Sequence, residues 1–141
     1  MQLESYMDLS DLFRSDRIRA AFSLRSFNHK RLDDRRGLST IIGLNPNHIV
    51  NPKQVHSAEI KFVYKPGEIP ATDALISKSN SIVLSIQVAD CIPLFLADPL
   101  HGIIGLVHAG WRGIEKRIIP NTDNRICLLY TSDAADDTPC V

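Results

Sequence analysis

Three side chains that can bind a metal ion or act in catalysis lie far apart in the sequence. They are His56, Cys91 and His108, separated by 35 and 17 residues. Such spacings exclude a short knuckle of the Cys-x-x-Cys kind, so only a folded sheet could gather the three groups. Two imidazoles and a thiolate that leave one position open are typical of catalytic zinc. Without a metal, Cys91 could instead act as a nucleophile with His108 as its base.

Four further residues beside these groups could take part in chemistry. Asp90 directly precedes Cys91 and could accept a hydrogen bond from an imidazole, or act as a general acid or base. Gly110 would allow close approach of the backbone. Arg112 could hold a phosphate or carboxylate in a forked manner, or form a surface salt bridge. Trp111 could stack on a planar ligand, or pack in the core.

The segments that carry these groups predict the elements that position them. The β-branched runs 81–88 and 92–96 predict strands covered on both faces, and 103–107 predicts a further strand. Asp90, Cys91 and His108 would then lie at the ends of neighbouring strands, where sites form in open α/β sheets.

The rest of the chain supplies weaker structural signals. Alternation predicts strands within 20–25, 48–56 and 60–64. Residues 35–39 predict a loop that pivots on Gly37, and residues 113–119 predict a helix ended by Pro120 and Asn121. Residues 70–77 are small and apolar with one acid, Asp73, to which the sequence assigns no role.

Composition restricts the class of protein. The chain has 141 residues, 44% of them apolar, which suffices for one packed domain. Acidic and basic residues number 16 each, so charge does not favour a nucleic-acid or membrane partner. The basic cluster Arg25–Arg36 also contains acids and predicts a solvated loop. With no signal peptide, no apolar run of the ~20 residues that span a bilayer and only three cysteines, we expect a cytoplasmic protein.

The character of the sequence changes near residue 125. Residues 125–141 lack helical or strand periodicity and are acidic. This predicts a disordered, non-homologous tail that does not belong to the domain. This segment also resembles the translated read-through of a sequencing adapter. We therefore expect a partial catalytic domain over 1–124 that is truncated at its C-terminus.

Four motifs carry a resemblance to a known family. Gln54-Val-His56, Thr72-Asp-Ala-Leu-Ile-Ser77, Val88-Ala-Asp-Cys-Ile-Pro93 and His108-Ala-Gly-Trp-Arg-Gly113 occur in this order. They resemble the YfiH-type family once labelled multicopper polyphenol oxidase (laccase-like). Its bacterial members are also called peptidoglycan editing factors or purine nucleoside phosphorylases. The resemblance spans roughly residues 20–119.

The resemblance implies a fold and an activity. It implies an α/β fold, a layered sheet with flanking helices similar to cysteine-hydrolase-like toxins and incomplete at the C-terminus. It implies a catalytic zinc on His56, Cys91 and His108. From its own chemistry and position beside Cys91, Asp90 is expected to be a further catalytic residue. Gly110, Trp111 and Arg112 are the expected substrate- and phosphate-binding residues.

The implied reactions act on purine nucleosides. Phosphorolysis of adenosine, inosine and S-methyl-5′-thioadenosine is expected, with adenosine deamination as a second activity. The expected partners are the nucleoside and phosphate, without nucleic acid or membrane. Three alternatives stay open: a zinc-free Cys91–His108 hydrolase, a non-catalytic module that binds zinc or a small ligand, and a copper phenol oxidase. Copper is the least favoured, because the sequence lacks the His-x-His pairs that a copper cluster would use.

Overall fold

The computed structural model describes residues 5–25, 27 and 31–133. Its strands are β1 (Tyr6–Asp8), β2 (Ala21–Ser23), β3 (Ile49–Pro52), β4 (Ile60–Phe62), β5 (Gly67–Ile69), β6 (Ala74–Ser77), β7 (Val83–Leu84), β8 (Ile92–Asp98) and β9 (Ile103–Ala109). Its helices are α1 (Arg31–Ile41), α2 (Trp111–Glu115) and α3 (Ile118–Asp133), with 3-10 turns at Ser10–Phe13 and Pro46–His48.

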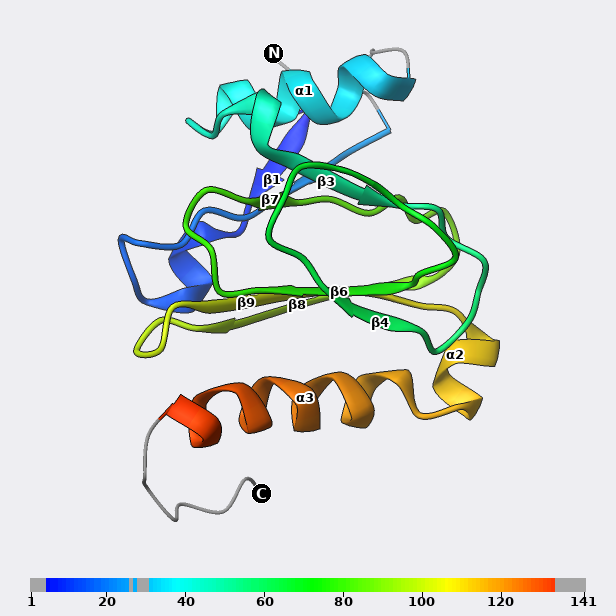
Figure 1. Ribbon diagram of the computed structural model, residues 1–141. Coiled ribbons are helices and arrows are strands. Elements are labelled where there is room, and N and C mark those ends of the chain that lie inside the picture. Colours follow the sequence, from blue (N-terminus) through cyan, green and yellow to red (C-terminus); the bar gives the residue numbers. More distant parts are fainter. Residues whose placement is uncertain (1–4, 26, 28–30, 134–141) are drawn as a thin grey trace.

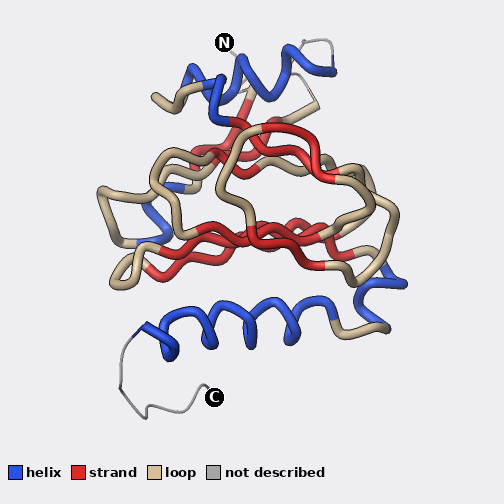
Figure 2. Tube along the Cα trace, in the orientation of Figure 1, coloured by secondary structure: helices blue, strands red, loops and turns tan. Residues whose placement is uncertain are grey.

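The elements stack in layers (Figures 1 and 2). A four-stranded sheet has the order β4-β6-β9-β8, and a parallel three-stranded sheet has the order β5-β3-β7. Helix α3 covers one face of the larger sheet, the smaller sheet lies over the other face, and α1 lies beyond the smaller sheet. This arrangement confirms the predicted layered α/β fold. None of the described helices is long and apolar enough to cross a membrane.

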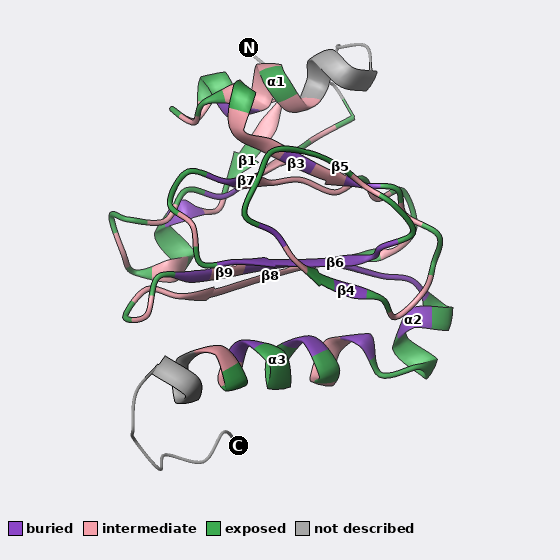
Figure 3. Cartoon of the chain, viewed as in Figure 1, coloured by how far each residue is buried: buried purple, intermediate pink, exposed green. Residues whose placement is uncertain are grey.

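The two faces of the larger sheet bury different sets of residues, because successive side chains of a strand point to opposite sides. Ala74 and Ile76 pack toward α3, in a cluster with Val107, Ile118 and Ile126 among others. Leu75 packs toward the smaller sheet, in a cluster with Val50, Val63 and Ile82. Strands β6 and β9 are therefore buried along most of their length (Figure 3).

The space between the two sheets is only partly filled. A cavity of about 580 Å³ lies there, bounded by β7, β8, β9, α1 and the segment around β2. Most of its lining is apolar, including Leu84, Phe95, Ile104 and Leu106.

Two predicted strands differ from the observed ones. The run 81–88 forms a strand only over Val83–Leu84, at the edge of the smaller sheet beside β3. Strand β8 is only half-buried, because it has β9 as its single neighbour. The doubly covered strands are instead β6 and β9, which occupy the centre of the larger sheet. The prediction that 81–88 and 92–96 are covered on both faces was therefore wrong.

The predicted loops at 25–36 and 35–39 were wrong where α1 runs through them from Arg31. Leu38 and Ile42 are four residues apart and both line the cavity between the sheets. That burial favours a helix over the cost of about 1 kcal/mol for Gly37 in a helical interior.

The helical region after β9 also differs from its prediction. The helix is interrupted not at Pro120 but near Arg117. The φ of Arg117 is 64°, a left-handed value that separates α2 from α3. Pro120 lies in the first turn of α3, where its missing N–H has no helical partner to lose.

Helix α3 continues through the segment predicted to be a disordered tail. It extends to Asp133, and Ile126 lies in the core cluster under the larger sheet. The predicted boundary at residue 124 thus falls inside this helix, and residues 134–141 lie outside the described part of the chain.

Candidate metal centre

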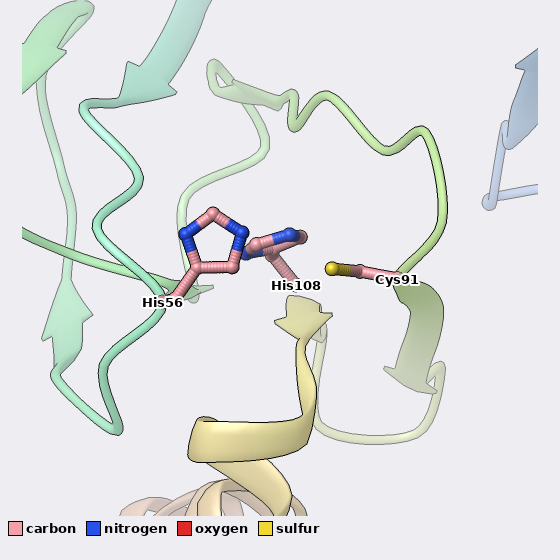
Figure 4. A group of neighbouring side chains, drawn as sticks. All are labelled: His56, Cys91 and His108. Carbon is pink, nitrogen blue, oxygen red and sulfur yellow. The ribbon is translucent and has the colours of Figure 1, made fainter.

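The three predicted ligands meet at one end of the four-stranded sheet (Figure 4). Strands β8 and β9 are antiparallel and pair Pro93 with His108. Cys91, just before β8, therefore lies beside His108, near the end of β9. His56 reaches the same place from the segment that links β3 to β4. The sequence predicted that Cys91 and His108 would be neighbours at strand ends, and the antiparallel pairing explains why they are.

The donor atoms of His56, Cys91 and His108 all lie within 4.8 Å of one another. The two imidazole rings are edge to face, with their centroids 5.0 Å apart and an interplanar angle of 74°. His108 is buried, Cys91 is a half-buried free thiol, and His56 is exposed, so the group is open to solvent on one side.

These residues fit a metal ion. Ligands of a tetrahedral zinc-like ion lie about 3.5 Å apart, given Zn–N near 2.0 Å and Zn–S near 2.3 Å. Small side-chain movements would close the observed group to that size. Imidazole and thiolate donors suit zinc or copper rather than magnesium or calcium. Three protein ligands and a solvent-exposed side also match a site that keeps one position for a substrate.

Gly110 permits this close packing. A Cβ atom there would lie 3.1 Å from Cδ2 of His56 and 3.3 Å from Sγ of Cys91. At Gly113, a Cβ atom would lie 2.9 Å from the carbonyl oxygen of Ser57. With any larger residue at this position, α2 could not pack so closely against the His56 segment. The close backbone approach expected at Gly110 is confirmed.

Asp73, which sequence reasoning left without a role, is buried beside the predicted ligands. Its Oδ1 accepts hydrogen bonds from the backbone N–H of His56 at 3.0 Å and from Nδ1 of His108 at 2.8 Å. Its Oδ2 accepts from the backbone N–H groups of Val55 and Ser57 at 3.2 and 2.8 Å, and from the Ser57 hydroxyl at 2.7 Å. One carboxylate thus contacts the segments of two predicted ligands.

The surroundings of Asp73 favour its ionised form. Burial raises the pKa of this carboxyl, but the hydrogen bonds from His108, Ser57 and Val55 outweigh burial and lower the pKa below its ordinary value. Because an ionised carboxylate can only accept hydrogen bonds, Nδ1 of His108 must carry the proton. Its Nε2 then keeps a lone pair for a metal or a proton.

A second polar contact ties the His56 segment to the Cys91 segment. The side-chain amide of Gln54 donates to the carbonyl oxygen of Gln87 at 2.6 Å and accepts from its backbone N–H at 2.8 Å. The residues before His56 and those before Cys91 are therefore joined across 33 positions of sequence.

Three other predicted site residues, Asp90, Trp111 and Arg112, are exposed and lie close to a predicted ligand in the sequence. Asp90 is exposed, and within the described residues the carboxylate that accepts from the His108 imidazole is Asp73, not Asp90. Trp111 begins α2 and is 70% exposed, which excludes core packing. The guanidinium of Arg112 lies 5.2 Å from the Trp111 ring centroid, and among the described residues it forms no salt bridge. The catalytic role of Asp90 and the ligand-binding roles of Trp111 and Arg112 stay predictions.

One signal in the sequence pointed to Asp73. It stands directly before Ala74-Leu-Ile76, an apolar run short enough to be a buried strand. A buried carboxylate requires hydrogen-bond donors, so an acid at that position is informative. Asp90 also stands beside an apolar run, but it is exposed and therefore needs no such partner.

Comparison with known families agrees with this geometry. The model of a family described as multi-copper polyphenol oxidoreductase laccase matches residues 23–138 of the chain. The chain belongs to this family. The match confirms the resemblance carried by the four motifs, and it extends beyond residue 124.

Curated relatives of the laccase-like chain have names that refer to nucleoside chemistry. A purine nucleoside phosphorylase of Deinococcus radiodurans is 37% identical over 97 residues, which are 69% of this chain and 38% of the relative. The purine nucleoside phosphorylase ORF3 of Streptomyces griseus is 38% identical over 82 residues, 55% of this chain and 33% of the relative. Adenosine deaminase RL5, from an unknown prokaryotic organism, is 30% identical over 106 residues, 68% of this chain and 40% of the relative.

Solved structures resemble the laccase-like chain to a similar extent. YlmD from Geobacillus stearothermophilus has a TM-score of 0.55 and 32% identity over 58% of this chain and 34% of its own. The hypothetical protein YfiH of Bacillus licheniformis has a TM-score of 0.55 and 26% identity over the same shares. The chain spans between 33% and 40% of the length of the curated relatives described above.

Proposed function

We propose that the chain carries the zinc centre of a purine nucleoside phosphorylase that acts on adenosine, inosine and S-methyl-5′-thioadenosine and also deaminates adenosine. The observation that carries this proposal is the convergence of His56, Cys91 and His108 within 4.8 Å. The names of the relatives, purine nucleoside phosphorylase and adenosine deaminase, supply the substrate class.

His56, Cys91 and His108 would hold the zinc ion through one imidazole nitrogen each and the thiolate sulfur. When bound there, zinc supplies Lewis-acid chemistry toward a phosphate or a water molecule. In phosphorolysis, a phosphate oxygen forms a bond to C1′ of the ribose while the bond from C1′ to N9 breaks and the purine takes up a proton. The protein would contribute mainly by positioning the reactants and neutralising charge.

Two exposed residues next to the centre are suited to hold the reactants. Arg112 carries a fixed positive charge with donors in a fork that matches a phosphate. Trp111 has a largely exposed side chain on which a purine could stack. Both follow Gly110, which contacts His56 and Cys91, so a nucleoside and a phosphate held there would lie beside the ligands.

The competing function is that of a zinc-free cysteine hydrolase, and one contact favours it. Asp73 accepts a hydrogen bond from Nδ1 of His108, as the third member of a Cys-His-Asp triad would. His56 argues against this function. A triad has no use for a second imidazole at the thiol, whereas a metal centre requires it.

The test of the proposed function is release of free purine from the three nucleosides by the zinc-loaded chain, with and without phosphate. The phosphorylase of Deinococcus radiodurans serves as a reference, and ammonia release from adenosine reports deamination. We expect purine release that depends on phosphate and stops after chelation. Bound zinc without turnover of any nucleoside would indicate the non-catalytic module instead.

Metal analysis separates zinc from the triad. We expect about one zinc per purified chain and at least a tenfold loss of affinity in Cys91→Ser and in His56→Ala. The Cys-His-Asp triad instead predicts that His56→Ala retains the hydrolase activity. It also predicts that the wild type contains almost no metal. Phenol oxidation that needs copper and fails with zinc would favour the family's older label over the phosphorylase.

A further inference from the structure

We propose that Asp73 is the positioning residue of this centre, because its single carboxylate sets the backbone of one imidazole ligand and the proton position of the other. This inference rests on the proposed metal centre for its consequence. Its structural part concerns only the described contacts of Asp73.

The first role of Asp73 concerns His56. The backbone of His56 has a φ of 59°, a left-handed conformation that is unfavourable for residues other than glycine. The N–H groups of Val55, His56 and Ser57 all point at the Asp73 carboxylate. Successive amides that converge on an anion form a nest, and hydrogen bonds to a charged acceptor are stronger than those to a neutral one. The carboxylate therefore stabilises the turn that directs His56 toward Cys91.

The second role concerns His108. Its backbone N–H donates to the carbonyl oxygen of Asp73 at 2.8 Å, and its ring Nδ1 donates to the carboxylate at 2.8 Å. Two contacts to the same residue fix both the main chain and the ring. Since Nδ1 keeps the proton, Nε2 remains available as the ligand atom.

Asp73 is itself held firmly enough to act in this way. Its side chain is fully buried, and its backbone N–H donates to the carbonyl oxygen of Glu59 at 3.1 Å. It directly precedes β6, which lies between β4 and β9 in the larger sheet. The same strand therefore determines the positions of His56 and His108 relative to each other.

The variant Asp73→Asn tests the proposal with almost no change in volume. The amide has one acceptor, so its NH₂ group must face either His108 and the His56 amide or the Ser57 donors. If it faces His108, the ring proton moves to Nε2 and blocks the ligand atom. If it faces Ser57, the backbone N–H groups of Val55 and Ser57, which flank His56, lose their acceptor.

The first measurement is the tautomer of His108 in the metal-free chain, read from its ring ¹⁵N shifts at about two pH units above the ordinary imidazole pKa of about 6.5. We expect the Nδ1–H form in the wild type. An Nε2–H wild type would overturn the proposal, and this reading needs neither zinc binding nor a folded variant.

The second measurement is zinc affinity by competition with a chromophoric chelator. We expect Asp73→Asn to bind zinc 10- to 100-fold more weakly than the wild type. The matched control is Ser77→Ala at the far end of β6. It removes a buried 2.7 Å hydrogen bond to the carbonyl oxygen of Val63 but touches no ligand. We expect the control to keep wild-type affinity.

An Asp73→Asn chain that binds zinc within twofold of the wild type would overturn the proposal. If the wild type binds no zinc at all, the proposed function fails while the tautomer measurement still decides the role of Asp73. The two failures are thereby distinguishable.

Discussion

At the scale of single residues, the centre depends on how closely the main chain approaches its side chains. Gly110 has φ and ψ of −78° and 167°, which any residue can adopt. The reason for glycine here is therefore the space between His56 and Cys91, not the backbone conformation.

This separation of causes makes Gly110→Ala an informative substitution. A methyl group 3.1 Å from the His56 ring would push the two ligands apart by a few tenths of an ångström. We expect a folded protein whose zinc affinity falls about tenfold, equivalent to about 1.4 kcal/mol. Chelator competition measures the affinity, and circular dichroism checks the fold.

Gly105→Ala is the matched control for this substitution. Its methyl group would lie 3.1 Å from Ile126 and 3.3 Å from Leu96, which is equally tight but on the α3 side of β9. It should lower stability and leave zinc affinity unchanged. Equal effects of the two variants on zinc affinity would refute a specific role for Gly110.

The sequence allowed the ligands to be predicted but not their supporting groups. His56, Cys91 and His108 have side chains with distinctive chemistry, so their types and the surrounding motifs identified them. Asp73 is one of many acids. Its importance comes from its burial and from hydrogen-bond donors on four residues that lie at least 16 positions away in the sequence. Such long-range contacts cannot be derived from local pattern.

At the scale of elements, the β8–β9 hairpin determines the distance between Cys91 and His108. Its turn is closed by Asp98, whose carboxylate accepts from the backbone N–H of His101 at 3.1 Å and lies 2.6 Å from Nδ1 of the same residue. Burial raises the pKa of Asp98, but its hydrogen bonds with His101 outweigh this and bring the pKa below its ordinary value.

A carboxyl with a lowered folded-state pKa stabilises the protein above its unfolded pKa, and this stability is lost as pH falls through the folded value. We therefore expect Asp98→Asn to cost about 1 kcal/mol at pH 7. The difference from the wild type should shrink below about pH 4, near the unfolded pKa of the acid.

Urea unfolding of the metal-free chain at pH 7 and pH 3, followed by circular dichroism, measures this difference. Asp16→Asn, a change to an exposed acid, is the control and should have little effect at either pH. A cost for Asp98→Asn that is the same at both pH values would contradict the linkage.

The elements were predictable where local pattern decides them. The apolar run 103–107 lies within β9, and 60–64 contains β4. The pattern failed for 81–88, because the number of neighbours in a sheet is set by topology. It also failed for α1, because Leu38 within the helix and Ile42 just beyond its end gain their partners only across the cavity.

At the scale of the whole molecule, the centre joins three segments that are far apart in the sequence. His56 lies on the connection from β3 to β4, Cys91 on the connection from β7 to β8, and His108 near the end of β9. One ion would therefore tie two connections between the smaller and the larger sheet to β9. A ligand that binds only the folded state stabilises it by mass action.

We expect zinc at a free concentration 100 times its Kd to stabilise the chain by about 2.7 kcal/mol. Chelation should lower Tm by several degrees, as measured by thermal unfolding with circular dichroism. Because its affinity for zinc is expected to fall at least tenfold, Cys91→Ser should lose about half or more of the zinc dependence of Tm. A Tm that responds to zinc equally in this variant would place the ion elsewhere.

The layered α/β architecture was predictable from the motifs, but the division into a four-stranded, a three-stranded and a two-stranded sheet was not. Parallel pairing of β3 with β5 and β7 depends on contacts between distant segments, and no short pattern specifies it. The extent of α3 was also missed, because its burial comes from the sheet above it rather than from its own periodicity.

The exposure of Trp111 gives the centre a built-in optical reporter. It is the sole tryptophan in the sequence, so the long-wavelength ultraviolet fluorescence of the entire chain arises from one indole. That indole is 70% exposed and immediately follows Gly110, which contacts His56 and Cys91. A ring stacked on it would quench or blue-shift the emission, so occupancy beside the ligands can be titrated without a label.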